Sequence, residues 1–441
     1  MSAAPRPIVG PLLRLAAPNW IVMVTLAAVS MIDIFFVGKL GLDALAGVSI
    51  TFPMMMLTQT MAAGGMGGGI AAAVARAHGA GNRAAVDRAA GQAVIVAVAM
   101  AALFIAVFVG LGRALYAAIG AAGPELEAAL AYSDVLFYGA VIMWAFHSLS
   151  AVVRGTGNMT FPAILLILTQ LIHVGLCPAL VFGVGPVPAL GVRGAALSAV
   201  LSFAPGVIAL TAYLVSGKRA ARLAVRHLRP DGATLWEILR VGVPGSANNV
   251  LTNANIVILT GLVAGHGTEA FTGFGIASRI EYIQSPLAFG LGAAILTMVG
   301  NEIGAGDHRR ARRVTWIGAA LTAALSGVIG MIGFAVPAWF VHQFSTDAQV
   351  TAYGVQYLRI VAPAYVCFGL GLGLWFAAQG AGRVKWPLIG SVVRVAMSSL
   401  GGWLVIHVAG AGLGGLFGLV AASFAAFGLV IAAATWAGKV V

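Results

Sequence analysis

The sequence predicts an all-α polytopic membrane protein in which twelve transmembrane helices form two lobes of six helices each. Three observations lead to this fold class: the composition, the spacing of the apolar runs, and an internal repeat. Of the 441 residues, 60% are hydrophobic and 9% are charged, whereas an average soluble chain is about 45–50% apolar and about 25% charged. The mean hydropathy is +0.98. Too few charged side chains are present to cover soluble domains, which excludes a soluble enzyme.

Twelve apolar runs are long enough to cross a bilayer, whose hydrocarbon core needs about 20 residues per helix. They are residues 12–37, 44–72, 89–111, 130–153, 161–184, 191–215, 236–264, 270–299, 314–335, 352–377, 386–408 and 413–437. The first run is too long for the core of a signal peptide, so we expect it to remain as the first span. The second, seventh and eighth runs are the longest, and Pro53, Pro244 and Pro286 are places where they can bend.

The basic residues predict how the chain is oriented in the membrane. With twelve spans, 19 of the 25 Lys and Arg residues fall on the side of the N-terminus, and only Lys39, Arg113 and Arg193 fall on the opposite side. Because basic loops stay in the cytoplasm, we expect both termini on the cytoplasmic side of the membrane. The basic residues form short clusters between apolar runs, so the net charge of +12 indicates a membrane surface and no nucleic-acid partner.

The second half of the chain matches the first half at one constant shift. Gly79-Ala80-Gly81 falls on Gly304-Ala305-Gly306, and at the same shift Gly155, Gly157 and Pro162 fall on Gly380, Gly382 and Pro387. Each half then holds six spans, and an even number gives both halves the same topology. We expect lobes at residues 1–215 and 236–441, joined by a cytoplasmic linker at 216–235. Two parallel six-span lobes are an architecture of secondary transporters.

Two acidic residues, Asp33 and Glu281, lie well inside predicted spans. A carboxylate in hydrocarbon is expensive, so a functional role is the default interpretation. We assign Asp33 to ion coupling; a fixed packing or salt-bridge role is the alternative. Glu281 has Arg279 as a neighbour and Arg394 as a second basic residue within the spans, so it either forms a structural pair or attracts a cationic substrate. Tyr282 and Gln284 are expected to line the same cavity.

Aromatic and methionine side chains within the spans suit a pocket for flat lipophilic cations, through cation–π contacts and adaptable packing. We assign Trp144 and Met55 to this cavity, with helix packing or lipid contact as the alternative for each. No HExxH or GxSxG motif is present, and no Lys-Ser/Thr follows the glycine run at 64–69. Cys177 and Cys367 lie far apart. We therefore expect no enzyme activity, no cofactor and no metal site.

Several longer motifs give a family resemblance that covers nearly the whole chain. They are Asp33–Gly41, Ala44–Ser49 followed by Pro53, Val74–Gly81, Ser278–Glu281, Gly290–Gly292 and Val299–Gly306. With these motifs the chain resembles the multidrug and toxic compound extrusion (MATE) family. The resemblance implies two six-helix lobes in a V shape, alternating access, and export of drug-like, often cationic, compounds in exchange for protons or sodium ions. The Arg279-x-Glu281 pair resembles the DinF-like branch more than the NorM-like branch.

The sequence departs from the family pattern at two places. The NorM-like branch has acidic residues in spans seven and ten, whereas span seven here offers asparagines, of which we assign Asn253 to the substrate cavity. DinF-like proteins typically have Asn-x3-Asp-Pro in span five, and Cys177 stands here in place of that Asp. His173 lies one helical turn earlier on the same face, and Ser198 on span six is a polar neighbour. We assign both, with Cys177, to the ion-coupling site; packing is the alternative for His173.

The leading functional hypothesis is a secondary active antiporter that exports drug-like cations. We expect protons as the coupling ion, with sodium as the alternative, and a monomer in the lipid bilayer that acts on small organic substrates. The competing hypothesis is a lipid-linked precursor flippase or an exporter of an endogenous metabolite. Flippases of that kind usually carry cationic cavities, and the predicted lobes hold few basic residues.

Overall fold

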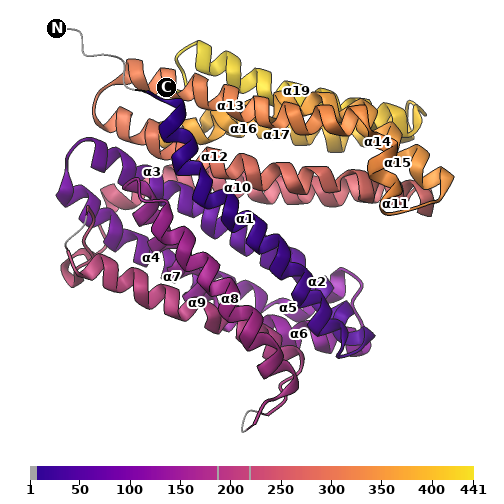
Figure 1. Ribbon diagram of the computed structural model, residues 1–441, viewed down its shortest axis with the longest axis horizontal. Helices are drawn as coiled ribbons and strands as arrows, with labels where there is room; N and C mark the ends of the chain where they lie inside the picture. The colour runs from indigo at the N-terminus through magenta and orange to yellow at the C-terminus, as the bar shows by residue number, and fades with distance from the viewer. Residues whose placement is uncertain (1–6, 186–187, 218–219) are drawn as a thin grey trace. The chain divides into compact units, whose positions relative to one another are not determined.

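The computed structural model describes residues 7–185, 188–217 and 220–441, except for the side chains at 24, 27–28 and 30–34. The described chain is nearly all helical (Figure 1). Among the described residues, ten helices are long and apolar enough to cross a membrane, and the pair Gly123–Tyr138 and Ala140–Gly155, bent by 48°, makes an eleventh span if it is counted as one. With the 30-residue helix α1 (Val9–Gly38), the structure is consistent with the twelve predicted spans.

Contacts divide the chain into two compact units, each of which is described by itself. The N-unit is Ala17–Gly242, and the C-unit is Val243–Val441 together with the described part of Met1–Ala16. The first helix of each half, α1 or α10, is therefore divided between the two units. Leu12 of α1 is fully buried among residues of the C-unit such as Ala294 and Val299. The lobe and linker boundaries that we drew from the sequence stay a prediction.

The N-unit contains α1 from Ala17 onward, the start of α10 up to Gly242, and the helices between them. They are α2 (Leu42–Thr60), the π-helix η1 (Met61–Gly65), α3 (Met66–Gly79), α4 (Arg83–Phe108), α5 (Gly112–Ala118), α6 (Gly123–Tyr138), α7 (Ala140–Gly155), α8 (Thr160–Phe182), α9 (Val192–Val215) and the 3₁₀-helix η2 (Val225–Leu228). Helix α7 packs against α3, α4 and α9. The irregular backbone lies at η1 and at the α6–α7 bend, whereas Pro53 lies inside the continuous helix α2.

The C-unit contains most of α10 (Gly232–Ala264) and all later helices. They are α11 (Thr268–Ala277), α12 (Arg279–Gly304), α13 (His308–Ala335), α14 (Pro337–His342), α15 (Ala348–Val361), the 3₁₀-helix η3 (Ala362–Ala364), α16 (Tyr365–Ala381), α17 (Lys385–Val395), the π-helix η4 (Ala396–Gly401), α18 (Gly402–His407) and α19 (Gly412–Trp436). Helix α16 lies against α12, α13 and α19 (Figure 1). Pro244 and Pro286 lie inside α10 and α12.

Glycine contacts between helices are repeated in the two units. A Cβ on Gly155 would lie 2.7 Å from the carbonyl oxygen of Ala71 in the N-unit. At the equivalent position of the repeat, a Cβ on Gly380 would lie 2.4 Å from the carbonyl oxygen of Leu296. Lipid gives no hydrophobic drive between helices, so close backbone approach at small residues holds them together. The internal repeat of the sequence is thus a repeat of helix contacts.

Candidate functional site

Glu281 is held by two tyrosine hydroxyls inside the C-unit. It is the third residue of α12 and is half-buried. The hydroxyl of Tyr357 on α15 donates a hydrogen bond to Glu281 Oε1, and the hydroxyl of Tyr365 on α16 donates to the same oxygen over 3.2 Å. Both tyrosines are buried, at 2% and 0% exposure. Neither was predicted from the sequence, although they stand two helical turns apart on span ten.

Arg394 is a buried cation near this carboxylate. Its Nη2 donates to Thr252 Oγ1 over 2.9 Å, and its guanidinium lies 5.6 Å from the ring centroids of both Phe368 and Phe427. The Nε atom has no partner among the described residues. Arg394 is close enough to Glu281 to attract it electrostatically, but no ion pair within 4 Å is found between the two in the described chain. Hydroxyls, not a guanidinium, therefore contact the carboxylate directly.

The π-helix η4 brings two consecutive serines to one asparagine. Ser398 and Ser399 both donate to Oδ1 of Asn255, over 2.5 and 2.9 Å. Asn255 is 4% exposed, whereas Asn253, which we had assigned to the cavity, is half-buried. Single-turn π-helices occur frequently at functional sites, so this polar cluster extends the candidate site along α10 and η4.

Three other predicted cavity residues do not gather around Glu281. The guanidinium of Arg279 lies 5.2 Å from the ring centroid of Phe344, and the described chain shows no ion pair between Arg279 and Glu281. Tyr282 is 64% exposed. Gln284 is fully buried, and neither its amide oxygen nor its amide nitrogen has a partner among the described residues. The geometry thus supports the tyrosine pair as the partners of Glu281.

In the N-unit, the structure brings His173 and Ser198 together. His173 Nδ1 lies 3.1 Å from Ser198 Oγ, and both side chains are buried. The hydroxyl of Ser198 also lies 2.7 Å from the carbonyl oxygen of Ala195 on the same helix. Cys177, one turn later on α8, is 1% exposed. Asp33 lies on α1, and its side chain is outside the described residues.

The two predicted N-unit cavity residues differ in their surroundings. Trp144 is fully buried, and its ring centroid lies 5.4 Å from that of Phe104. Its indole nitrogen has no partner among the described residues. Met55 is half-buried, and its sulfur accepts a hydrogen bond from the Tyr132 hydroxyl over 3.7 Å. Trp144 is therefore a core residue of the helix packing around α4 and α7.

The glycine run at 64–69 serves helix packing. It spans the end of η1 and the start of α3, and Arg154 Nη2 donates to the carbonyl of Ala63 within η1 over 3.1 Å. A Cβ on Gly69 would lie 2.5 Å from the carbonyl oxygen of Ile238. Within the described chain, no three His, Cys, Asp or Glu side chains gather closely enough to hold a metal ion.

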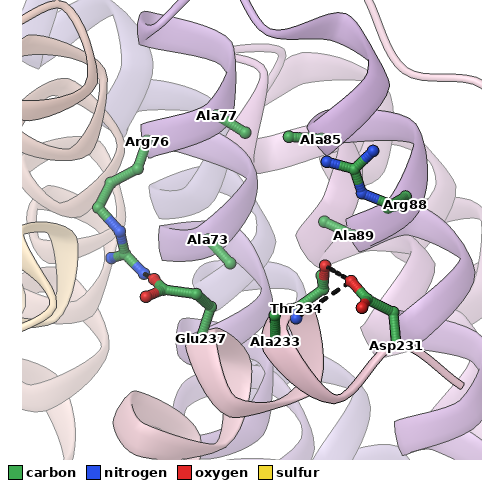
Figure 2. Close-up of a pocket in the computed structure, with 10 residues that line it drawn as sticks. All are labelled: Ala73, Arg76, Ala77, Ala85, Arg88, Ala89, Asp231, Ala233, Thr234 and Glu237. Atoms are coloured by element: carbon green, nitrogen blue, oxygen red, sulfur yellow. Dashed lines mark hydrogen bonds and ion pairs between the residues drawn. The ribbon is translucent and has the colours of Figure 1, made fainter.

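A hollow of about 350 Å³ lies in the N-unit where α3 and α4 meet the start of α10 (Figure 2). Arg76, Arg88, Asp231, Thr234 and Glu237 are its polar lining residues. Sequence reasoning placed none of these in a site, because nothing in the local pattern shows that residues 76 and 237 meet. Hydrogen bonds from the hydroxyl and backbone of Thr234 hold the pKa of Asp231 below its ordinary value.

The fold and the polar groups inside its spans define a polytopic helical transporter. A model of the MatE family matches residues 18–179 and again 244–404. The chain belongs to the MatE family, and it is a membrane transporter, not an enzyme. The ends of the two matched segments, residues 179 and 404, are related by the shift that carries Gly155 onto Gly380, and their starts differ from it by one residue, so the family model recognises the same internal repeat.

Individual comparisons agree with this family. The probable multidrug resistance protein YoeA of Bacillus subtilis is 25% identical over 370 residues, which are 83% of this chain and 80% of YoeA. The FAD transporter of Shewanella oneidensis is 25% identical over 401 residues, 89% of this chain and 87% of that protein. A crystal structure of MATE in the bent conformation has a TM-score of 0.88 at 22% identity and covers 97% of this chain and 96% of its own. This likeness confirms the helical fold.

Proposed function

We propose that this transporter exports drug-like organic cations in exchange for protons, and that it belongs to the DinF-like branch of its family. The observation that carries the proposal is the environment of the Glu281 carboxylate. Two buried hydroxyls contact it, and no cation in the described chain contacts it. A hydroxyl donor does not cancel the charge of a carboxylate as a guanidinium would, so the ionised form of Glu281 can attract an organic cation. Aromatic rings near Arg394 add an apolar wall to the same region.

We propose that proton coupling takes place in the N-unit, at Asp33 with His173 and Ser198. Histidine changes its charge in the physiological range of pH, and His173 already forms a hydrogen bond to Ser198. Sodium is the competing coupling ion.

The test is transport of ethidium into inverted membrane vesicles under either a pH gradient or a sodium gradient. We expect a pH gradient alone to drive uptake, and Glu281→Gln to lower it while Glu269→Gln, an exposed carboxylate of the same unit, serves as control. Uptake that follows only the sodium gradient would overturn proton coupling. Equal uptake by both variants would remove Glu281 from the substrate site.

A metabolite exporter is the second candidate, because one relative carries the name FAD transporter. A flavin nucleotide is an anion, so it would be attracted by Arg394 and repelled by Glu281. FAD offered to the same vesicles distinguishes the two: FAD uptake that Arg394→Gln abolishes would favour the metabolite. We further propose a monomer in the bacterial inner membrane with both termini in the cytoplasm.

A further inference from the structure

The hollow in the N-unit has an apolar floor. Five alanines from α3, α4 and α10 line it: Ala73, Ala77, Ala85, Ala89 and Ala233. Small side chains at these positions leave the space of about 350 Å³ open, which is at the lower end of the range for small-ligand sites. The floor suits a short carbon chain, and any charged group of an occupant must be met by the rim.

Glu237 is one fixed charge on this rim. Its Oε2 accepts hydrogen bonds from Arg76 Nη2 over 2.8 Å and from Arg240 Nη2 over 2.7 Å. Both guanidiniums use the same oxygen, so Oε1 remains without a hydrogen bond from the described residues. Two guanidiniums hold the carboxylate in place, and its second oxygen can accept from a ligand.

Asp231 is the second fixed carboxylate. Its Oδ2 accepts from the backbone N–H and the hydroxyl of Thr234, at the first turn of α10 (Figure 2). Its backbone N–H donates to Oε1 of the buried Gln92 over 3.1 Å, which ties this turn to α4. The carboxylate therefore stays charged and in place at neutral pH.

Arg88 is the charged lining residue whose guanidinium has no hydrogen bond or ion pair in the described chain. It is exposed, and it acts electrostatically on Asp231 without contacting it. Figure 2 shows Arg88 and Arg76 on opposite sides of the alanines, with Asp231 and Glu237 on the α10 side. The rim thus offers a cation for an anionic group and carboxylate oxygens for a cationic group.

We propose that this hollow binds a zwitterion that carries a phosphate and a primary ammonium, the chemistry of the phosphoethanolamine headgroup. The phosphate would be held by Arg88, and the ammonium, which has three N–H donors, by Glu237 and Asp231. Arg88 lies near the start of α4, directly before the long apolar stretch of that helix. We therefore expect Arg88 to lie at the depth of the lipid headgroups. The headgroup can come from an ethanolamine lipid or from a free phosphoethanolamine ester.

Native mass spectrometry of the delipidated full-length protein tests this proposal. The protein is titrated with phosphatidylethanolamine, phosphatidylcholine and phosphatidylglycerol of the same acyl chains, and with soluble glycerophosphoethanolamine. We expect phosphatidylethanolamine to bind about tenfold more tightly than either other lipid, because choline has no N–H donors and glycerol has no cation. Glycerophosphoethanolamine that competes at equal concentration would assign the same site to a free ester.

Variants complete the experiment. Arg88→Gln is expected to weaken phosphatidylethanolamine binding about tenfold, and Ala85→Leu is expected to weaken it by filling the floor while leaving every charge in place. Arg313→Gln is the matched control, since Arg313 is exposed and stands at the equivalent position of the repeat, on α13. Equal affinity for all three lipids, or an equal effect of Arg88→Gln and Arg313→Gln, would overturn the proposal. The assay is independent of transport, so it separates this site from the proposed export function.

Discussion

At the scale of single residues, the C-unit solves the problem of placing a carboxylate inside a membrane protein with neutral donors. Two tyrosine hydroxyls contact Glu281, while Arg394 is directed to Thr252 and to two aromatic rings. A direct Arg–Glu pair would cancel both charges and leave little attraction for a cationic substrate. The tyrosines therefore determine whether the Glu281 carboxylate is available to a cationic substrate.

Removing one tyrosine hydroxyl should weaken substrate binding more than turnover. We expect Tyr357→Phe to raise the KM for ethidium about tenfold with little change in maximal rate, because a hydrogen bond to a charged group contributes about 1.5–3 kcal/mol. Transport kinetics in inverted vesicles measure both parameters. Tyr353→Phe on the same helix is the control. A lowered rate at unchanged KM would place Tyr357 in the conformational change instead.

Asp33 is expected to be necessary for coupling. In Asp33→Asn the carboxamide has a similar shape but cannot take up or release a proton, so gradient-driven export should fall to background while the protein remains folded in the membrane. Vesicle transport together with gel filtration of the purified variant checks this. Wild-type transport in Asp33→Asn would move the coupling site to other residues.

His173 should set part of the pH dependence. We expect His173→Gln to shift the pH profile of transport and His173→Leu to impair transport, because leucine removes the ring nitrogen that shares a hydrogen bond with the Ser198 hydroxyl. Cys177→Ala should leave transport and its pH profile nearly unchanged. The pH–rate profile of each variant, corrected for expression, is the measurement. Unchanged pH profiles in both histidine variants would show that the His173–Ser198 pair serves only helix packing.

At the scale of helices, close glycine contacts hold each unit together. Gly155 brings α7 against α3, and Gly380 brings α16 against α12, in the same register of the two halves. Backbone carbonyls stand where a Cβ would be, and a backbone cannot move aside as a flexible side chain can. At these two positions glycine is needed because of helix packing.

A methyl group at either position should destabilise its unit. We expect Gly155→Ala and Gly380→Ala each to cost about 1–3 kcal/mol, as overpacking of a close contact does. Thermal unfolding followed by fluorescence-detected gel filtration measures the effect. Gly175→Ala is the control, because that glycine lies in α8 with nothing within 4 Å of the added Cβ. Equal melting temperatures in all three variants would contradict the importance of the contacts.

At the scale of the whole molecule, each compact unit includes the start of the other half's first helix. The N-unit keeps the beginning of α10 through the ion pair between Arg76 and Glu237 and through Gln92, which donates to the carbonyls of His227 and Arg229. The described part of the linker from His227 to Asp231 is thus attached to α4. These contacts attach the end of the linker and the start of α10 to the N-unit.

The orientation of the chain is testable by labelling. We expect a cysteine at Gly232, at the start of α10, to react with a membrane-impermeant maleimide only after the cells are permeabilised, because the basic residues place the linker in the cytoplasm. A cysteine at Ala117 on the exposed side of α5 is the control and should react in intact cells. Labelling of Gly232→Cys in intact cells would contradict the predicted topology.

Apolar run length, the repeat between the two halves and the family motifs could be determined from the sequence alone. Run length sets which segments can cross a bilayer, and composition leaves no alternative to helices there. The sequence also placed Glu281 in a span and His173 one turn from Cys177, because such relations are local. The pairing of His173 with Ser198 followed from the neighbouring spans five and six, and the structure brings the two together.

Tertiary structure alone decided which distant residues meet. Glu281 and Tyr357 are 76 residues apart, and Arg76 and Glu237 are 161 apart, so no local pattern relates them. Arg279, two residues before Glu281, was the obvious partner by spacing, but neighbours at i and i+2 on a helix point in different directions. The hollow at α3, α4 and α10 likewise exists only after packing. Its floor consists of alanines from three helices, and their small side chains leave a space only when those helices lie together.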